Sequence, residues 1–319
     1  MKRNIHKYDI AVMAALLSVS INAGAVQPVR ATENIEYSTV VNPIIPKSVD
    51  FAGKKIDLDR IDMYERFDRE LTSMIYTHGN TLLTIKRANR YFPMMAKILK
   101  ANGIPSDMLY LACIESYLNP RAYSPAKAAG MWQFIPSAAK EYGLEINDEV
   151  DQRYDIGKAT AAACKYLKRA YSKYGNWESA AASYNGGMGR ISSELQKQGV
   201  SSAYDLYLTD ETSRYMFRLL AMKAIMENPS EFGFKLSPSQ LYQPIPVEIV
   251  EVNGPVDDWA IWAKKYGITY AQLREENPWI RAKKLTNKAG KTYQVRVPKK
   301  DSLFRSKQKI TTYNPNWTK

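Results

Sequence analysis

The residues most able to do chemistry lie at the end of one apolar segment. Residues 109–114 are almost entirely apolar and predict a buried helix, and Glu115 follows them directly. Burial disfavours the charged form of a carboxyl group and so raises its pKa. A glutamate that stays protonated near neutral pH can donate a proton to the leaving oxygen of a glycosidic bond. The alternative is a glutamate at a helix end whose side chain points into solvent.

Hydroxyl, amide and aromatic side chains follow this acid, and sugar sites are commonly built from such groups. The chain breaks at Asn119-Pro120, passes through small residues and restarts after Gly130. A second small-residue segment, 182–190, is predicted to be a loop after a helix, where glycines let a backbone approach a ligand closely. A simple helix end and turn is the alternative for that segment. The residues expected to contact or support a sugar are Ser116, Ser124, Trp132, Gln133, Phe134, Tyr184 and Asn185.

The number of suitable acids bears on the reaction. Hydrolytic glycosidases typically use two carboxylates about 5 to 10 Å apart. No second acid occupies a comparable apolar motif, and the acidic stretch 141–151 reads as solvated surface. A mechanism with one acid is therefore the favoured hypothesis, and hydrolysis with a second acid is the alternative.

The elements that would position these groups are mainly helical. Residues 58–230 show helical periodicity with hardly any alternating pattern, and a second helix after His78 is expected to be interrupted or to end near Phe92-Pro93. After a Pro-rich linker, the order strand, helix, helix, strand predicts a small α+β domain. The predicted organisation is a signal peptide at 1–25, an extended arm or linker at 26–57, a helical domain at 58–230, a linker at 231–244, a βααβ domain at 245–300 and a polar basic tail, expected to be poorly ordered, at 301–319.

Composition and the N-terminus restrict the function classes. A basic start, a short apolar run and Ala23-Gly24-Ala25 predict a removable signal peptide and therefore an exported protein of the bacterial periplasm or cell envelope. No later segment is expected to span a membrane. The net charge of +13 indicates an anionic partner, but the lysines are scattered, which argues against nucleic acid. With two histidines, one of them in the predicted signal peptide, no metal or other cofactor is expected. Cys113 and Cys164 are read as small buried hydrophobes, with a single bridge left open.

The ordered motifs resemble those of lytic murein transglycosylases of glycoside hydrolase family twenty-three, and most of all the membrane-bound D-type subgroup. The motifs are Glu115-Ser116, Ser124, residues 130–133, residues 182–187 and residues 211–215. The resemblance implies a lysozyme-like fold in which Glu115 is the single acid and base. It implies cleavage between N-acetylmuramic acid and N-acetylglucosamine with formation of a 1,6-anhydro sugar. It also implies that Ser124 and Gln133 contact the N-acetyl groups of the sugars or hold the site, and that Asn185 shapes its loop. Tyr184 and Tyr215 would form hydrogen bonds near the glutamate. Glu211 would be a structural polar residue.

Residues 257–298 resemble a LysM domain, which implies binding to glycans that contain N-acetylglucosamine and association with the cell wall. The sequence departs from the usual glycine-aspartate-threonine start of that domain, because Asn253-Gly-Pro-Val-Asp257 stands there. A packing domain without glycan binding is the alternative for this segment. For the whole chain, a non-catalytic peptidoglycan-binding protein is the alternative from another class.

Overall fold

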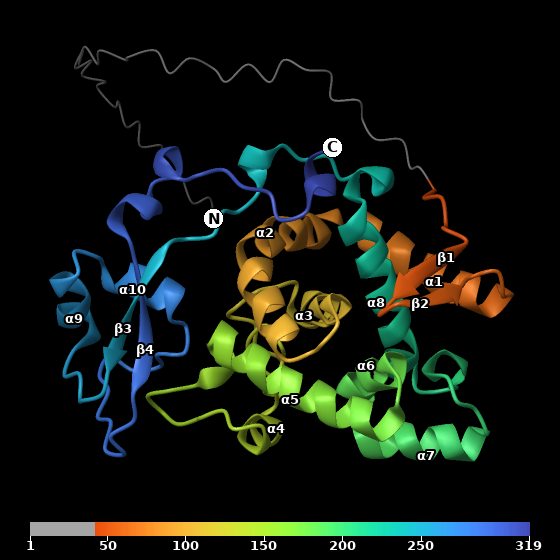
Figure 1. Cartoon of the computed structure of the whole chain (residues 1–319), viewed down its shortest axis with the longest axis horizontal. Helices are drawn as coiled ribbons and strands as arrows, with labels where there is room; N and C mark the ends of the chain where they lie inside the picture. Colours follow the sequence, from red (N-terminus) through yellow and green to blue (C-terminus); the bar gives the residue numbers. More distant parts are fainter. Residues whose placement is uncertain (1–41) are drawn as a thin grey trace, which may run out of the picture. The chain divides into compact units, whose positions relative to one another are not determined.

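The computed structural model describes residues 42–319, and the predicted signal peptide and residues 26–41 of the predicted arm lie outside the described residues (Figure 1). The described chain has a mainly helical body and a small part with two paired strands and two helices, as the sequence predicts. The helices of the body are α1 (Ile61–Tyr76), α2 (His78–Ala101), α3 (Leu109–Ser116), α4 (Pro136–Glu141), α5 (Ile156–Tyr174), α6 (Trp177–Gly186), α7 (Met188–Gln198) and α8 (Asp210–Glu227). Within residues 42–319, no helix combines the length and apolarity that crossing a membrane requires.

Helix α3 forms the centre of the body, with α2, α5 and α8 around it (Figure 1). Leu111, Ala112 and Cys113 have no exposed surface, because the helix is apolar on every side. Both cysteines are buried and free, as small core residues. The buried helix therefore carries Glu115 outward from the core of the body.

Two predictions about helix boundaries are wrong. Helix α2 runs without interruption through Pro93. A proline in a helix interior costs about 3 kcal/mol, and fully burying one large apolar side chain stabilises by about 1.5–3 kcal/mol. Phe92 and Met95 on either side of Pro93 are both buried, which offsets the cost. The predicted loop at 182–190 is instead the end of α6 and the start of α7, joined at Gly187 with φ +77°.

A β-hairpin at the start of the described chain was not expected from the sequence. Strands β1 (Ser48–Phe51) and β2 (Lys54–Asp57) pair in antiparallel register around Ala52-Gly53, both with positive φ. Phe51 is buried in the core of the body, and the backbone N–H of Ala52 donates to Asp107 beside α3. These residues of the predicted arm are thus packed on the body rather than extended from it.

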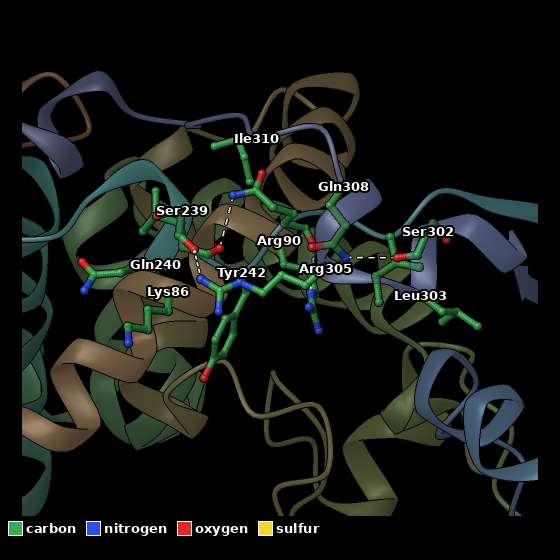
Figure 2. Close-up of a pocket in the computed structure, with 13 residues that line it drawn as sticks. Lys86, Arg90, Ser239, Gln240, Tyr242, Ser302, Leu303, Arg305, Gln308 and Ile310 are labelled. Carbon is green, nitrogen blue, oxygen red and sulfur yellow. Dashed lines mark hydrogen bonds between the residues drawn. The ribbon is translucent and has the colours of Figure 1, made fainter. Parts of the chain in front are cut away.

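The C-terminal tail also packs on the body, contrary to the prediction that it is poorly ordered. Trp317 is 2% exposed, and its indole N–H donates to the carbonyl of Met226 at the end of α8. The Asn89 side chain on α2 accepts from the backbone of Tyr313 and donates to the carbonyl of Thr311. Figure 2 shows a pocket of about 490 Å³ at this junction, lined by residues of α2, the linker and the tail. Burial of Trp317 therefore holds the tail on the body, although most of the segment is polar.

The small part near the C-terminus has the predicted order βααβ. Its elements are β3 (Val247–Val252), α9 (Trp259–Lys265), α10 (Tyr270–Glu276) and β4 (Tyr293–Pro298), and the two strands pair antiparallel, from Val247 opposite Pro298 to Val252 opposite Tyr293. Fully buried Asn277 links α10 to β4, because its side chain bonds both the N–H and the carbonyl of Arg296. Ala129, Val150 and Tyr154 of the body share the hydrophobic core of this part.

Candidate active site

Glu115 lies at the last turn of α3, where the backbone ends the helix abruptly. Tyr117 and Leu118 both have positive φ, 52° and 53°, and the N–H of Tyr117 closes the helix on the carbonyl of Cys113. Ser116 is buried, and its hydroxyl donates to the carbonyls of Ala112 and Met131. Ser116 therefore ties the helix end to the loop that follows and does not line the cleft.

The carboxyl of Glu115 faces a cleft of about 730 Å³. The hydroxyl of Tyr215 on α8 donates to Oε1 of Glu115 at 2.7 Å. Burial raises the pKa of Glu115 from 4.5 to about 7, against the opposing effect of the bond from Tyr215; Glu211 raises it further and Arg218 lowers it. The acid is thus divided between its protonated and ionised forms near neutral pH, as a group that both gives and takes a proton requires.

The loop between α3 and α4 brings Ser124 and Gln133 to the same cleft. Ser124 closes a tight turn, in which its N–H donates to the carbonyl of Ala128 and its hydroxyl accepts from the N–H of Ala128. Gln133 has φ +50°, and its side-chain amide donates to the carbonyl of Gly130 at 2.8 Å. At Gly130, φ is +75° and an added Cβ would lie 1.9 Å from the carbonyl oxygen of Arg153, so only glycine fits.

Trp132 does not form an aromatic surface of the cleft, contrary to the sequence-based expectation. Its side chain is fully buried, and its indole N–H donates to the hydroxyl of Thr160 on α5 at 2.9 Å. A tryptophan between two buried elements removes more apolar surface from water than one on a cleft wall. Phe134 and the 44% exposed Ile135 line the cleft instead.

The C-terminal end of α6 and the N-terminal part of α8 also contribute residues to the cleft. Tyr184, Asn185 and Tyr215 all line it. The hydroxyl of Tyr184 donates to the backbone carbonyl of Trp132 at 2.8 Å, which links α6 to the loop that carries Gln133. Burial raises the pKa of both tyrosines well above their usual range, so both hydroxyls keep their protons and act as donors.

Three residues of the cleft with polar or charged side chains were not identified as such from the sequence. Tyr166 on α5, Glu211 and Arg218 all line the cleft. Glu211 was read as a structural polar residue, and the structure places this exposed carboxylate in the same cleft as Glu115. A signal existed in the spacing, because residues 211, 215 and 218 are four and three apart and so share one face of a helix.

Comparison with known proteins adds to this geometry. Residues 93–206 match the family described as the transglycosylase SLT domain. Residues 248–301 match the soluble lytic transglycosylase C-terminal LysM-like domain. Glu115, Ser124, Gln133, Tyr184 and Asn185 fall within the first match.

Two similar relatives are membrane-bound lytic murein transglycosylase D from two strains of Escherichia coli. Each is 31% identical over 241 residues, which make up 74% of this chain and 51% of the relative. The chain therefore spans about half the length of these relatives. Among solved structures, the 70 kDa soluble lytic transglycosylase of Escherichia coli aligns with 50% of this chain and 30% of its own, at 20% identity and a TM-score of 0.38.

The structure has an acid at the end of a buried helix with a polar and aromatic cleft around it, and the two family matches follow each other along the chain. The chain therefore carries a transglycosylase SLT domain followed by a LysM-like C-terminal domain, and it is homologous to membrane-bound lytic murein transglycosylase D.

Proposed function

We propose that the protein is an enzyme that cleaves the glycan strands of peptidoglycan between N-acetylmuramic acid and N-acetylglucosamine without consuming water. The observation that carries this proposal is Glu115, a carboxyl with a pKa raised to about 7 that accepts a hydrogen bond from Tyr215 in a cleft of about 730 Å³. The homology to a murein transglycosylase supports the substrate class. Such a substrate implies a location in the cell envelope.

In the proposed reaction, protonated Glu115 gives its proton to the glycosidic oxygen as the bond from that oxygen to C1 breaks. The carbonyl oxygen of the substrate's own N-acetyl group stabilises the positive charge that develops at C1. The Glu115 carboxylate then removes the proton of the C6 hydroxyl, whose oxygen bonds to C1 and closes the 1,6-anhydro ring. Glu115 ends protonated, as it began, so one residue completes the cycle.

Tyr215 would hold the Glu115 carboxyl in place and stabilise its ionised form between the two steps, since a hydrogen bond to a carboxylate favours the charged form. Ser124, Gln133 and Asn185 line the cleft and would bond the N-acetyl and hydroxyl groups of the sugars. Tyr184 would support the site through its bond to the Trp132 carbonyl. Ser116 and Trp132 would support the fold of the site, because both are buried.

One observation favours a second candidate, a muramidase that uses water. Glu211 lines the same cleft as Glu115, so a second carboxyl is available there. In a hydrolytic mechanism, Glu211 would activate a water molecule or stabilise the cation. The two candidates differ in whether solvent oxygen enters the product.

The test is mass spectrometry of the products from purified peptidoglycan sacculi digested in water enriched in ¹⁸O. We expect 1,6-anhydro ends with no ¹⁸O at the new terminus. Reducing ends that carry one ¹⁸O for each cut, lost in Glu211→Gln, would establish the muramidase instead. Glu115→Gln should lose cleavage while still binding sacculi, whereas a variant with wild-type turnover would remove Glu115 from its proposed role. An absence of any product from the wild-type protein would favour a non-catalytic peptidoglycan-binding protein.

We also propose the domain boundaries 58–230, 231–244 and 245–300 and export through residues 1–25, which remain sequence-based. The LysM-like domain is proposed to bind glycan. Retention of the full chain on insoluble peptidoglycan, compared with a chain truncated after residue 244, tests that part.

A further inference from the structure

A further pocket lies beside the proposed active site, between the helical body and the LysM-like domain. It measures about 940 Å³, and we call it the arginine pocket. The body contributes Arg121, Tyr123 and Tyr154, and the LysM-like domain contributes Tyr270, Arg274 and Arg281. Tyr123 is adjacent in sequence to Ser124, which lines the active-site cleft. One loop therefore forms part of the wall of both spaces.

The charge balance of the arginine pocket is positive. Arg121 pairs with Glu275 at 2.8 Å, and Arg153, a buried residue that also lines the pocket, pairs with Asp151 at 2.7 Å. Arg274 and Arg281 also line the pocket, and neither forms an ion pair with a carboxylate of the described chain. Two guanidinium groups therefore face this space without a counter-charge from residues 42–319.

Arg274 is held in place but is not fully bonded. One terminal nitrogen donates to the Tyr270 hydroxyl at 2.6 Å, while its buried Nε has no hydrogen-bond partner among the described residues. A buried donor without a partner is unfavourable, and it is a feature that a bound ligand can satisfy. Arg281 is stacked on the Tyr154 ring, with its guanidinium carbon 4.4 Å from the ring centroid.

This chemistry matches a carboxylate attached to a flexible chain. A guanidinium binds a carboxylate through two parallel hydrogen bonds, and the 60% exposed Tyr123 offers an apolar face beside it. In peptidoglycan, the N-acetylated sugars are neutral where the lactyl group is joined to peptide, and the free carboxylates belong to the peptide stems. The arginine pocket therefore complements the stem rather than the glycan.

We propose that the arginine pocket binds a carboxylate of a peptidoglycan peptide stem while the adjacent cleft holds the glycan strand. This inference rests on the proposed function, because it assumes peptidoglycan as the substrate. Since the pocket requires Arg274 and Arg281 from the LysM-like domain, that domain would act in substrate recognition through its contact with the body. The enzyme would then favour strands that carry peptides over strands without them.

A binding experiment with the full chain tests the pocket separately from catalysis. The probes are a synthetic stem tetrapeptide and the same peptide with its carboxylates amidated, titrated at fixed ionic strength. We expect the free acid to bind more tightly, and Arg274→Gln to weaken it about tenfold, as for loss of a charge-assisted hydrogen bond. Glu275→Gln should strengthen binding, because it frees Arg121. Lys264→Gln, which removes an exposed charge on α9 outside both spaces, should have no effect.

Opposite effects of Arg274→Gln and Glu275→Gln on binding of the acid peptide would exclude a purely structural role for the pocket. If the pocket only joins the two parts, Arg274→Gln and Glu275→Gln should both lower the melting temperature and neither should separate the free acid from the amidated peptide. Equal binding of the two peptides by the wild-type protein would overturn the proposal.

Kinetics distinguish this inference from the proposed function. With strands that carry peptides, Arg274→Gln should raise KM and leave kcat unchanged, and with strands stripped of peptide it should change neither. Equal KM values for the two kinds of strand in the wild-type protein would refute the stem site while leaving the proposed reaction intact. A protein that binds the acid peptide but cleaves neither strand would refute the reaction and leave the binding site intact.

Discussion

Replacement of Glu115 by glutamine is expected to stabilise the folded protein above neutral pH. The pKa of Glu115 is raised from 4.5 to about 7 in the folded chain, mainly by burial. Below pH 4.5 the carboxyl is neutral in both the folded and the unfolded chain. Between pH 4.5 and about 7 the unfolded chain releases this proton while the folded chain keeps it, so the free energy of unfolding falls as the pH rises.

The size of this effect follows from the same two values. One pKa unit corresponds to about 1.4 kcal/mol, so the rise from 4.5 to about 7 amounts to at most about 3.5 kcal/mol of stability lost by the wild-type protein above neutral pH. Glutamine resembles the neutral acid and still accepts the hydrogen bond from Tyr215, so Glu115→Gln should escape this loss. The difference in stability should be near zero at pH 4.5 and reach its maximum by about pH 8.

The assay is urea unfolding of both proteins at four pH values from 4.5 to 8.5, followed by tryptophan fluorescence. Other titrating groups are common to both proteins and cancel in the difference. Glu231→Gln, a substitution of an exposed glutamate outside the cleft, is the matched control and should show no pH-dependent gain. A difference that is constant with pH, or a Glu115→Gln protein less stable than wild type at pH 8, would refute the reasoning.

Three further substitutions follow from particular contacts. Tyr215→Phe removes the hydrogen bond that lowers the pKa of Glu115, so the alkaline limb of the kcat/KM profile should move up by about one pH unit, and an unmoved limb would contradict this. Gly130→Ala forces a Cβ against the Arg153 carbonyl at positive φ, and it should cost at least about 2 kcal/mol by chemical denaturation together with most of the activity. Trp317→Ala should cost about 3–5 kcal/mol in the same assay with kcat retained, and a loss below 1 kcal/mol would show that the tail is not part of the core.

Local patterns in the sequence predicted the features of the fold that depend on residues close together in the chain. Helix α3 follows from an almost entirely apolar run, α5 and α8 follow from helical patterns with their end signals, and the βααβ order follows from two alternating segments around two short helical ones. The position of Glu115 at the end of an apolar helix was visible for the same reason. These features depend on contacts within one element, which the sequence specifies directly.

Contacts between distant segments produced the errors. The hairpin at 48–57, the packed tail around Trp317 and the burial of Trp132 each depend on a surface made by residues far away in the chain. An aromatic residue after a loop has the same local pattern whether it lines a cleft or fills a core. Trp132 is in the core, where burial removes its apolar surface from water and Thr160 on α5 accepts the hydrogen bond of its indole N–H.

The sequence by itself determined the type of fold, the order of the two parts and the acid at the end of the buried helix. Only the tertiary structure decided what surrounds that acid: the bond from Tyr215 one hundred residues away, the presence of Glu211 and Arg218 in the same cleft, and the arginine pocket beside it. Periodicity records which face of an element is apolar, and it does not record which other element covers that face. The pKa of Glu115 is raised mainly because other elements cover it, and the sequence alone left open whether that side chain is buried or points into solvent.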